Sequence, residues 1–317
     1  MRSQTLLLGV VRTSAFIIAL ICSSHCATAT DLFVSSTGND SNPGTSNAPL
    51  KTLQAAVGKI TGPGFNVKVR AGNYTGFNYG WNDEPRGTAQ APIVFEAVEA
   101  GVSITQRNAN TPDGINIEGT DSDPMAYVVV QGFTVNNMPR AGIRAAVAHH
   151  ITIRNNSCNA NSTWGILTGH VDDLLIENNT TTTSVTQHGI YVGNSGDRPV
   201  IRNNTSSGNA GSGIQLNADA SNGGDGIITN AVIEGNLIYN NGRLGGAALN
   251  MDGVQNSLFV NNVLYNPNYR QFDVEGYRVY RGRVDAPNEL TLLAQFDYAG
   301  TTIRDYTGTV NPGVNCA

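Results

Sequence analysis

Cysteine, lysine and charged residues in general are scarce in this sequence of 317 residues. Two of its four cysteines lie within the first 26 residues, so a disulfide framework cannot hold the fold together. Charged residues make up 14% of the chain and the formal net charge is −5, which argues against a nucleic acid as partner. Stability must therefore come from packing of the chain on itself.

Long apolar runs are also missing. The run over residues 15–21 is too short to span a bilayer. Arg2 and Arg12 precede this run, and the small residues 27–29 follow it. This order predicts an export signal over residues 1–29. Removal of this signal would take the net charge from −5 to −7. We therefore predict a secreted or periplasmic protein with no membrane association after cleavage.

The sequence does contain a short pattern that occurs five times between Arg140 and Asn262. Each copy opens with glycine and an apolar residue and continues as an apolar strand that ends in asparagine. The glycines, spaced 23, 24, 24 and 33 residues apart, are Gly142, Gly165, Gly189, Gly213 and Gly246. A repeat of this length predicts a solenoid. Because apolar residues alternate with period two, the repeating units are strands, and strands that recur in one direction pair in parallel.

These glycine-isoleucine columns, asparagine ladders and spacings resemble the right-handed parallel β-helix proteins of the pectate lyase-like superfamily. The segments 35–45 and 52–56 are similar to the entry segment of secreted β-helix carbohydrate enzymes. A leucine-rich repeat is the alternative, but its Leu-x-x-Leu-x-Leu rhythm is missing. We therefore predict an all-β fold, a right-handed parallel β-helix over residues 30–268.

Two segments of different character flank this solenoid. Leu53, Ala56, Val57 and Ile60 fall on one helical face, which predicts a short N-terminal capping helix over the open end. Residues 269–317 resemble the middle strands of a fibronectin type III module, yet they have about half the length of such a sandwich. We interpret them as a partial module, or as a hairpin docked on the end of the solenoid.

The glycines also predict which side chains point outward. The second position after each glycine points outward and reads Arg144, Leu167, Tyr191, Gln215 and Ala248. The fourth position reads Ala146, Gly169, Gly193, Asn217 and Asn250. Since adjacent coils are about 4.8 Å apart, Trp164 and His188, which each precede a glycine, should be neighbours. We expect a shallow trough beside these residues, with His170 at its edge.

This combination of side chains suits a polysaccharide. An aromatic face stacks on a sugar ring, Arg144 can pair with a uronate carboxylate, and His188 or Tyr191 can move a proton near neutral pH. The predicted catalytic residues are His188, Tyr191 and Arg144. The predicted substrate-binding residues are Trp164, His170, Gln215 and Asn217. The alternatives are that Trp164 caps the apolar ladder and that His188 is a turn residue bonded to backbone.

Acidic residues gather at the next bend, and those predicted as metal ligands are Asp172, Asp173, Asp197 and Asp219. Oxygen ligands from successive coils can hold Ca²⁺, and the resemblance implies calcium because many pectate lyases use it to neutralise the substrate carboxylate. Aspartate is also a favourable turn residue, which is the alternative.

The leading interpretation is a monomeric, polysaccharide lyase-like enzyme that cleaves an acidic extracellular glycan by β-elimination. The family often uses lysine as the base, whereas Lys51, Lys59 and Lys68 all precede the regular coils. This departure leaves open a non-catalytic carbohydrate-binding or surface-structural β-helix. A glycoside hydrolase is the third class, with Asp172 and Asp197 on adjacent coils as its carboxylate pair.

Overall fold

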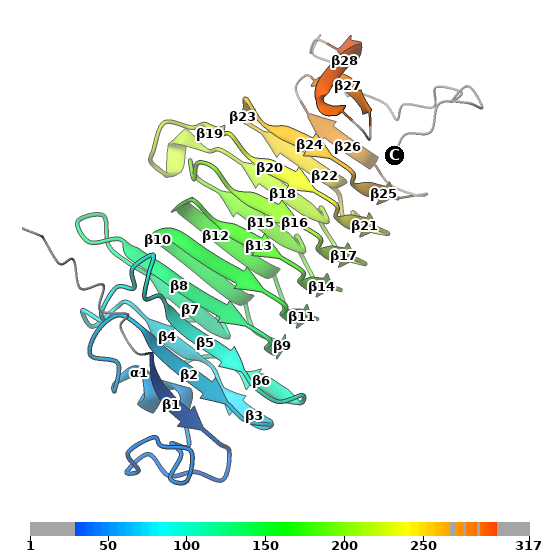
Figure 1. The fold of residues 1–317 in the computed structure, drawn as a ribbon. Helices are drawn as coiled ribbons and strands as arrows, with labels where there is room; N and C mark the ends of the chain where they lie inside the picture. The colour runs from blue at the N-terminus through cyan, green and yellow to red at the C-terminus, as the bar shows by residue number, and fades with distance from the viewer. Residues whose placement is uncertain (1–28, 267–269, 275–276, 284–285, 297–317) are drawn as a thin grey trace, which may run out of the picture.

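The computed structural model describes residues 29–266, 270–274, 277–283 and 286–296. In these residues the chain forms a parallel β-helix, an all-β solenoid whose coils stack along one axis (Figure 1). The predicted all-β solenoid of parallel strands is thereby confirmed. None of the described helices is long and apolar enough to cross a membrane.

Each coil contributes strands to three faces. The first face consists of β4 (Phe77–Tyr79), β7 (Ile115–Glu118), the first half of β10 (Ala141–Arg154), β12 (Trp164–Asp172), β15 (Ile190–Gly193), β18 (Ile214–Asn217), β22 (Ala247–Asp252) and β26 (Arg270–Val274). The second face consists of β1 (Thr30–Val34), β2 (Phe65–Val69), β5 (Ile93–Ala97), β8 (Met125–Gln131), the second half of β10, β13 (Leu175–Glu177), β16 (Val200–Arg202), β20 (Val232–Glu234) and β24 (Leu258–Val260). Strand β10 serves both faces because it bends at Val147, whose φ is 47°.

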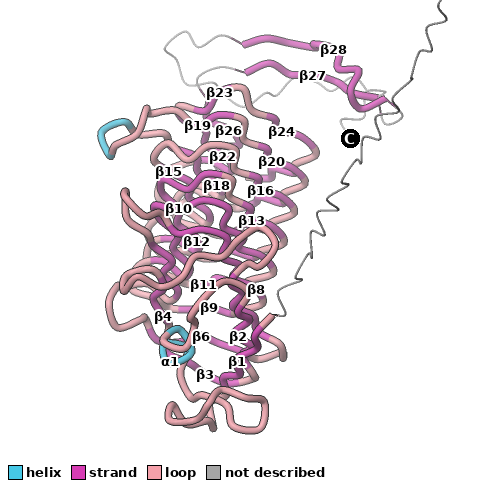
Figure 2. Tube along the Cα trace, turned by 60° about the vertical axis from the view of Figure 1, so that its left-hand side comes forward, coloured by secondary structure: helices cyan, strands magenta, loops and turns pink. Residues whose placement is uncertain are grey.

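The third face is a separate sheet of eight strands. It consists of β3 (Gly72–Thr75), β6 (Val102–Gln106), β9 (Thr134–Asn136), β11 (Ser157–Asn159), β14 (Thr180–Thr182), β17 (Thr205–Ser207), β21 (Leu237–Tyr239) and β25 (Val263–Tyr265). The small pair β19 (Ile228–Thr229) and β23 (Val254–Gln255) lies beside the later coils. A loop that carries the 3-10 helix η1 (Ala220–Asn222) stands out from these coils (Figure 2).

Two neighbouring asparagines have different roles at each bend between the second and third faces. The first one adopts the left-handed conformation, with φ of 57° at Asn155, 55° at Asn178 and 55° at Asn203. The second one is buried and stacks on its equivalent in the next coil. This ladder runs through Asn156, Asn179, Asn204, Asn236 and Asn262. Every rung satisfies buried backbone groups as well, so the ladder replaces the hydrogen bonds that a bend would lose.

The predicted register is confirmed through four coils and is wrong in the fifth. Ile143, Ile166, Ile190 and Ile214 stack as one fully buried column. Leu249, and not Ala247, then lies opposite Ile214, so Asn250 takes the place that was predicted for Ala248. A shift of two residues keeps every side chain on its own side of the strand, and the alternation therefore fits both alignments.

A short helix lies at the predicted place near the N-terminus. Helix α1 (Leu53–Val57) begins after Thr52, whose side chain accepts a hydrogen bond from the Ala55 N–H, and buries Leu53, Ala56 and Val57. Its exposed Gln54 acts as a strand partner for the edge of β4. The Gln54 amide accepts from the Asn78 N–H (2.9 Å) and donates to the Asn78 carbonyl (3.2 Å).

We expect Gln54→Ala to lower the free energy of unfolding by about 1–2 kcal/mol, because Asn78 is fully buried and its N–H would lose its partner. Lys51→Ala, a truncation of an exposed side chain two residues before the helix, should change it by less than about 0.5 kcal/mol. Urea denaturation of both variants measures the difference. Equal stability of the two would show that Gln54 does not protect the strand edge.

The parallel ladder of the first face runs on past the predicted boundary at residue 268, since β26 pairs with β22. Strands β27 (Tyr277–Arg283) and β28 (Ala286–Phe296) then form an antiparallel hairpin. The predicted export signal, except for residue 29, and the last part of the fibronectin-like segment lie outside the described residues.

Candidate functional site

The outward side chains of the first face form two adjacent columns that run along the solenoid. The first column contains Asn78, Asn116, Arg144, Leu167, Tyr191, Gln215 and Asn250. The second contains Glu118, Ala146, Gly169, Gly193, Asn217 and Asp252. Apart from Arg144, Glu118 and Asp252, these residues are amides, small residues, one leucine and one tyrosine.

Three aromatic side chains meet at the middle of this face, as predicted. The rings of Trp164 and Tyr191 are stacked, with centroids 6.0 Å apart and an interplanar angle of 24°. The imidazole of His188 lies 5.4 Å from the Tyr191 ring. A Cβ added at Gly193 would come within 3.3 Å of Cζ of Tyr191, so this glycine makes room for the tyrosine ring. All three rings are partly exposed, and the cluster can therefore contact a ligand.

Amide side chains from the next coils hold the polar end of this cluster. Asn217 donates through Nδ2 to the Tyr191 hydroxyl oxygen at 3.0 Å. Gln215 accepts through Oε1 from the Ser212 hydroxyl (3.1 Å) and from Asn250 Nδ2 (2.9 Å). The predicted pair Gln215 and Asn217 thus lies beside Tyr191, and Gln215 is itself buried.

The protonation state of His188 follows from its one backbone contact. The Ser212 N–H donates to Nδ1 of His188 at 2.8 Å. A nitrogen that accepts a hydrogen bond carries no proton, so the neutral ring must hold its hydrogen on Nε2. Burial lowers the pKa of His188 to about 4. The expectation that His188 titrates near neutrality is therefore not met, and at neutral pH the residue is a hydrogen-bond donor through Nε2 and a poor base.

This lowered pKa predicts a loss of stability in mild acid. The unfolded chain takes up a proton at His188 as the pH falls through 6.5, whereas the folded chain does not until the pH approaches 4. Between pH 7 and pH 5 the wild type should lose about 2 kcal/mol of unfolding free energy through this group. His188→Asn retains an acceptor for Ser212 and cannot titrate. Its unfolding free energy should therefore fall by about 2 kcal/mol less than that of the wild type between pH 7 and pH 5. If the two proteins lost the same unfolding free energy in acid, the lowered pKa of His188 would be contradicted.

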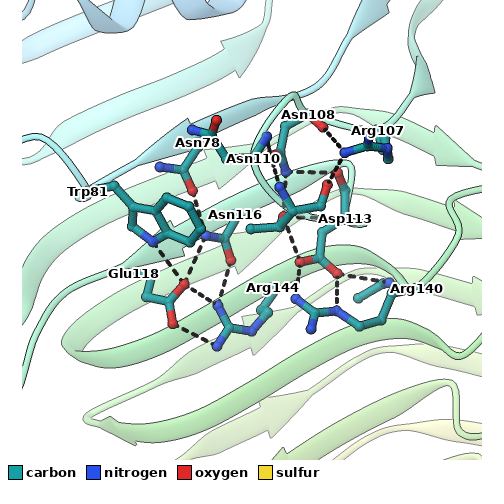
Figure 3. Close-up of polar contacts among 12 residues, drawn as sticks. Asn78, Trp81, Arg107, Asn108, Asn110, Asp113, Asn116, Glu118, Arg140 and Arg144 are labelled. Atoms are coloured by element: carbon teal, nitrogen blue, oxygen red, sulfur yellow. Dashed lines mark hydrogen bonds and ion pairs between the residues drawn. The ribbon is translucent and has the colours of Figure 1, made fainter.

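A second polar cluster on the same face was not predicted. Glu118 accepts from Arg144 Nη1 (2.5 Å) and Nη2 (2.8 Å), and it also accepts from the indole N–H of Trp81 at 3.0 Å (Figure 3). Arg144 Nη1 also donates to Asn116 Oδ1 at 2.8 Å. Burial raises the pKa of Glu118, but the hydrogen bonds and charge of Arg144, with those from Asn116 and Trp81, outweigh it and hold the pKa below its usual value. Arg144 is therefore already paired with a carboxylate.

A neighbouring ion pair fixes the loop that precedes β7. Asp113, whose side chain is fully buried, accepts from Arg140 Nε at 2.8 Å and from Nη2 at 2.5 Å. Its carboxylate also accepts from the Thr111 hydroxyl, and Asn108 Nδ2 donates to the Thr111 hydroxyl oxygen in turn. This pair stiffens the edge of the first face. The sequence signal for the Glu118 cluster was the alternation Ile115-Asn116-Ile117-Glu118, which lies before the regular repeats.

His170 does not join the aromatic cluster. It lies at the bend between the first and second faces, with φ of 53°, and its Nε2 is 3.1 Å from the Asn222 carbonyl oxygen. Together with His149 and Asp172 it lines an open pocket of about 260 Å³. The prediction that His170 borders the same trough as Trp164 is therefore wrong, because the left-handed residue turns the chain away from the first face.

The predicted calcium ligands do not fit a calcium site as arranged. Arg198 Nε and Nη2 bind the Asp173 carboxylate at 2.7 and 3.0 Å, and Nη2 also reaches Asp172 at 3.3 Å. Asp197 accepts from the backbone and hydroxyl of Thr229, and Asp219 accepts from the Ser221 N–H within its own turn. Among the described residues, no group of three or more His, Cys, Asp or Glu side chains is placed to hold a metal ion.

A melting experiment tests the calcium site that the sequence predicted. Because a guanidinium already lies among three of the carboxylates, we expect the melting temperature to be the same, within about 1 °C, in EDTA and in millimolar CaCl₂. MgCl₂ at the same ionic strength is the control. A rise of several degrees with calcium alone would establish a site that forms on binding.

The family model described as "Right handed beta helix region" matches residues 113–280. A pectate lyase of Emericella nidulans, PEL9, is 36% identical over 95 residues, which make up 30% of this chain and 21% of that protein. The chain thus spans about a fifth of this relative.

The fold is shared with solved structures, two of which illustrate the similarity. The GH136 lacto-N-biosidase from Eubacterium ramulus superposes with a TM-score of 0.55 at 14% identity, over 75% of this chain and 56% of that one. ORF18 of Geobacillus virus E2 superposes with a TM-score of 0.53 at 14% identity, over 76% and 50% of the two chains. At this identity the likeness concerns the fold alone.

Proposed function

Since this chain belongs to the right-handed β-helix family, whose model matches more than half of its length, we propose that it is an exported, monomeric, polysaccharide-active protein. The substrate lies along the first face, and the proposed reaction is β-elimination at a uronic acid. The stacked pair of Trp164 and Tyr191, with the N–H of His188 beside it, is the observation that supports this function. The matched segment of the Emericella nidulans pectate lyase favours the same class of substrate.

In this mechanism Tyr191 transfers the proton. The step requires the phenolate form of Tyr191, whose oxygen accepts a hydrogen bond from the Asn217 amide and takes the hydrogen from the carbon next to the carboxyl group. The electron pair forms a carbon–carbon double bond, and the bond to the glycosidic oxygen breaks. Tyr191 then gives the same proton to the leaving oxygen, so the enzyme returns to its starting state. Trp164 stacks on a sugar ring, and His188 donates from Nε2 to a sugar oxygen.

A second candidate is a β-helix that binds a polysaccharide without cleaving it. Strands β4 to β22 of the first face contain no lysine, and neither ring nitrogen of His188 is available as a base at neutral pH. Tyr191 would then contribute only stacking and hydrogen bonds. The hydrolase alternative has less support, because Asp172 and Asp197 lie past the bend and contact Arg198.

A panel of extracellular polysaccharides separates these functions. The purified protein is incubated with each polymer while ultraviolet absorbance of unsaturated ends and release of reducing sugar are recorded. We expect both signals to rise together, as elimination requires. Reducing ends without absorbance would indicate hydrolysis. If a polymer retards the protein in affinity electrophoresis and neither signal rises, the binding function remains. No interaction with any polymer would refute the proposal.

A further inference from the structure

The chain has two tryptophans, and the proposed mechanism uses only Trp164. The other one, Trp81, follows β4 closely and is 47% exposed. Its indole N–H donates to Glu118 of the first face at 3.0 Å (Figure 3). A tryptophan that combines an exposed ring with a bonded N–H is typical of binding surfaces, because the ring offers apolar contact area and the bond fixes its orientation. Trp81 is therefore a candidate contact for a ligand on this face.

The acceptor of this indole N–H is itself held in place. Glu118 accepts from both terminal nitrogens of Arg144, and from Asn116 Nδ2 at 3.1 Å. Asn116 Nδ2 also donates to Asn78 Oδ1 at 2.6 Å. The side chains of Glu118 and Arg144 are only 21% and 18% exposed, so water competes little for these bonds. Residues from three successive strands, β4, β7 and β10, thus fix the orientation of the Trp81 ring.

The backbone around Trp81 is fixed by a second carboxylate. Glu84 is buried, and its Oε2 accepts from the Gly80 N–H at 3.0 Å and from the Asn82 N–H at 2.7 Å. These two N–H groups belong to the residues on either side of Trp81. Burial of a carboxylate is costly unless it is hydrogen-bonded, and here the loop itself supplies the donors. The loop therefore presents Trp81 on a rigid backbone, although the ring stays half in water.

Small side chains separate Trp81 from the aromatic cluster of Trp164, His188 and Tyr191. Strand β7, which carries Glu118, lies two coils from β12 and three coils from β15. At the usual spacing of coils this is about 10–14 Å. Over that interval the second outward column contains only Ala146 and Gly169. A ligand on the cluster can thus extend along this column to Trp81 without meeting a large side chain of the column.

We propose that Trp81 is a second sugar-binding platform, and that one glycan chain contacts both it and the aromatic cluster. This inference rests on the proposed function and adds the length of the substrate to it. The apolar face of one sugar ring stacks on the Trp81 indole, while another ring of the same chain stacks on Trp164. Two neighbouring rings of a disaccharide are too close together to contact both platforms. The ligand is therefore a longer oligosaccharide or a polymer, and Glu118 and Arg144 are positioning residues for the second platform.

Tryptophan fluorescence tests this proposal, because Trp164→Phe leaves only the emission of Trp81 and Trp81→Phe leaves only that of Trp164. The probes are the disaccharides and hexasaccharides of galacturonate and of alginate, with binding measured by calorimetry. We expect at least one hexasaccharide to change both emissions, and its disaccharide to change that of Trp164 alone. A bound hexasaccharide that leaves the Trp81 emission unchanged, or a disaccharide that changes both, would overturn the inference and leave the polysaccharide function standing. If neither hexasaccharide binds, both proposals fail.

Affinities of variants measure the contribution of the ring. Trp81→Ala should weaken binding of the hexasaccharide about tenfold and leave that of the disaccharide unchanged. Tyr265→Ala removes an equally exposed ring from the third face and is the matched control, for which we expect no change in either affinity. Trp81→Phe retains a ring but cannot donate to Glu118, so its loss should be intermediate. Equal hexasaccharide affinity of Trp81→Ala and Tyr265→Ala would show that Trp81 does not contact the glycan.

The positioning role of Glu118 has a separate readout. In the Trp164→Phe background, Glu118→Ala should lower the fluorescence anisotropy of Trp81, because the ring loses its fixed acceptor. Hexasaccharide affinity should fall as in Trp81→Ala, and the combined variant should lose no more than either alone. Melting curves show whether Glu118→Ala is folded, and if it is not, Trp81→Phe breaks the same hydrogen bond and serves in its place for the affinity test. Unchanged anisotropy in folded Glu118→Ala would show that Glu118 does not position the ring.

Discussion

Replacing Ile190 by aspartate should leave the protein largely unfolded at room temperature. Ile190 is fully buried between Ile166 and Ile214 of the adjacent coils. The substitution removes about 1.5–3 kcal/mol of apolar burial and places a carboxyl group where it has no hydrogen-bond partner, at a further cost of several kcal/mol. Small domains have about 5–15 kcal/mol of stability in total. Circular dichroism during urea denaturation measures the loss.

Thr183→Asp is the matched control, because it introduces the same carboxylate at an exposed bend. Thr183 has φ of 54°, a conformation that aspartate tolerates better than threonine. Its hydroxyl donates to Asn159 Oδ1 at 2.6 Å, so we expect a loss of at most about 1 kcal/mol. Similar melting of the two variants would contradict the assignment of Ile190 to the interior.

Tyr191→Phe should abolish most of the proposed cleavage while the fold is retained. The phenylalanine ring can still stack on Trp164, but the oxygen that accepts from Asn217 is lost. A side chain that transfers a proton in the transition state contributes about 10²- to 10⁴-fold to the rate, so turnover should fall by that factor with little change in polymer binding. Initial rates of absorbance increase and affinity electrophoresis give the two quantities.

Tyr265→Phe removes a hydroxyl from an exposed tyrosine on the third face and should keep the wild-type rate. His188→Asn should lower turnover less than Tyr191→Phe, since His188 contributes one hydrogen bond and no proton transfer. If Tyr191→Phe retained full activity on a cleaved polymer, another group would have to move the proton, and the proposed mechanism would be wrong.

The sequence predicted the regular coils well because each rung repeats a local rule. An isoleucine after glycine turns inward, and the residue after it turns outward, so Trp164, His188 and Tyr191 could be placed on one surface from spacing alone. This alternation determines which side of the strand a residue faces, but not the register between neighbouring coils. In the last coil the longer loop before β22 allowed a shift of two residues that alternation cannot detect.

The chemistry of the face depended on partners that lie on irregular coils. Arg144 was predicted as a uronate ligand because a guanidinium can pair with a carboxylate, whereas its actual partner Glu118 lies on β7, ahead of the regular array. The environment of His188 was missed for a similar reason. A Cβ at Gly211 would lie 2.7 Å from Nδ1 of His188, so the next coil passes close over the Nδ1 side of the ring and shields that side from water.

The buried asparagines have a consequence for how such a protein can change over evolutionary time. Each asparagine from Asn156 to Asn236 presents the same donors to the coil after it and the same acceptor to the coil before it. A gene duplication or deletion that spans one whole coil would therefore join matching rungs and leave no amide without a partner. A shorter insertion would be accommodated only at a bend, as in the loop that carries η1. Inheritance can thus lengthen the first face one coil at a time, while the interior stays the same.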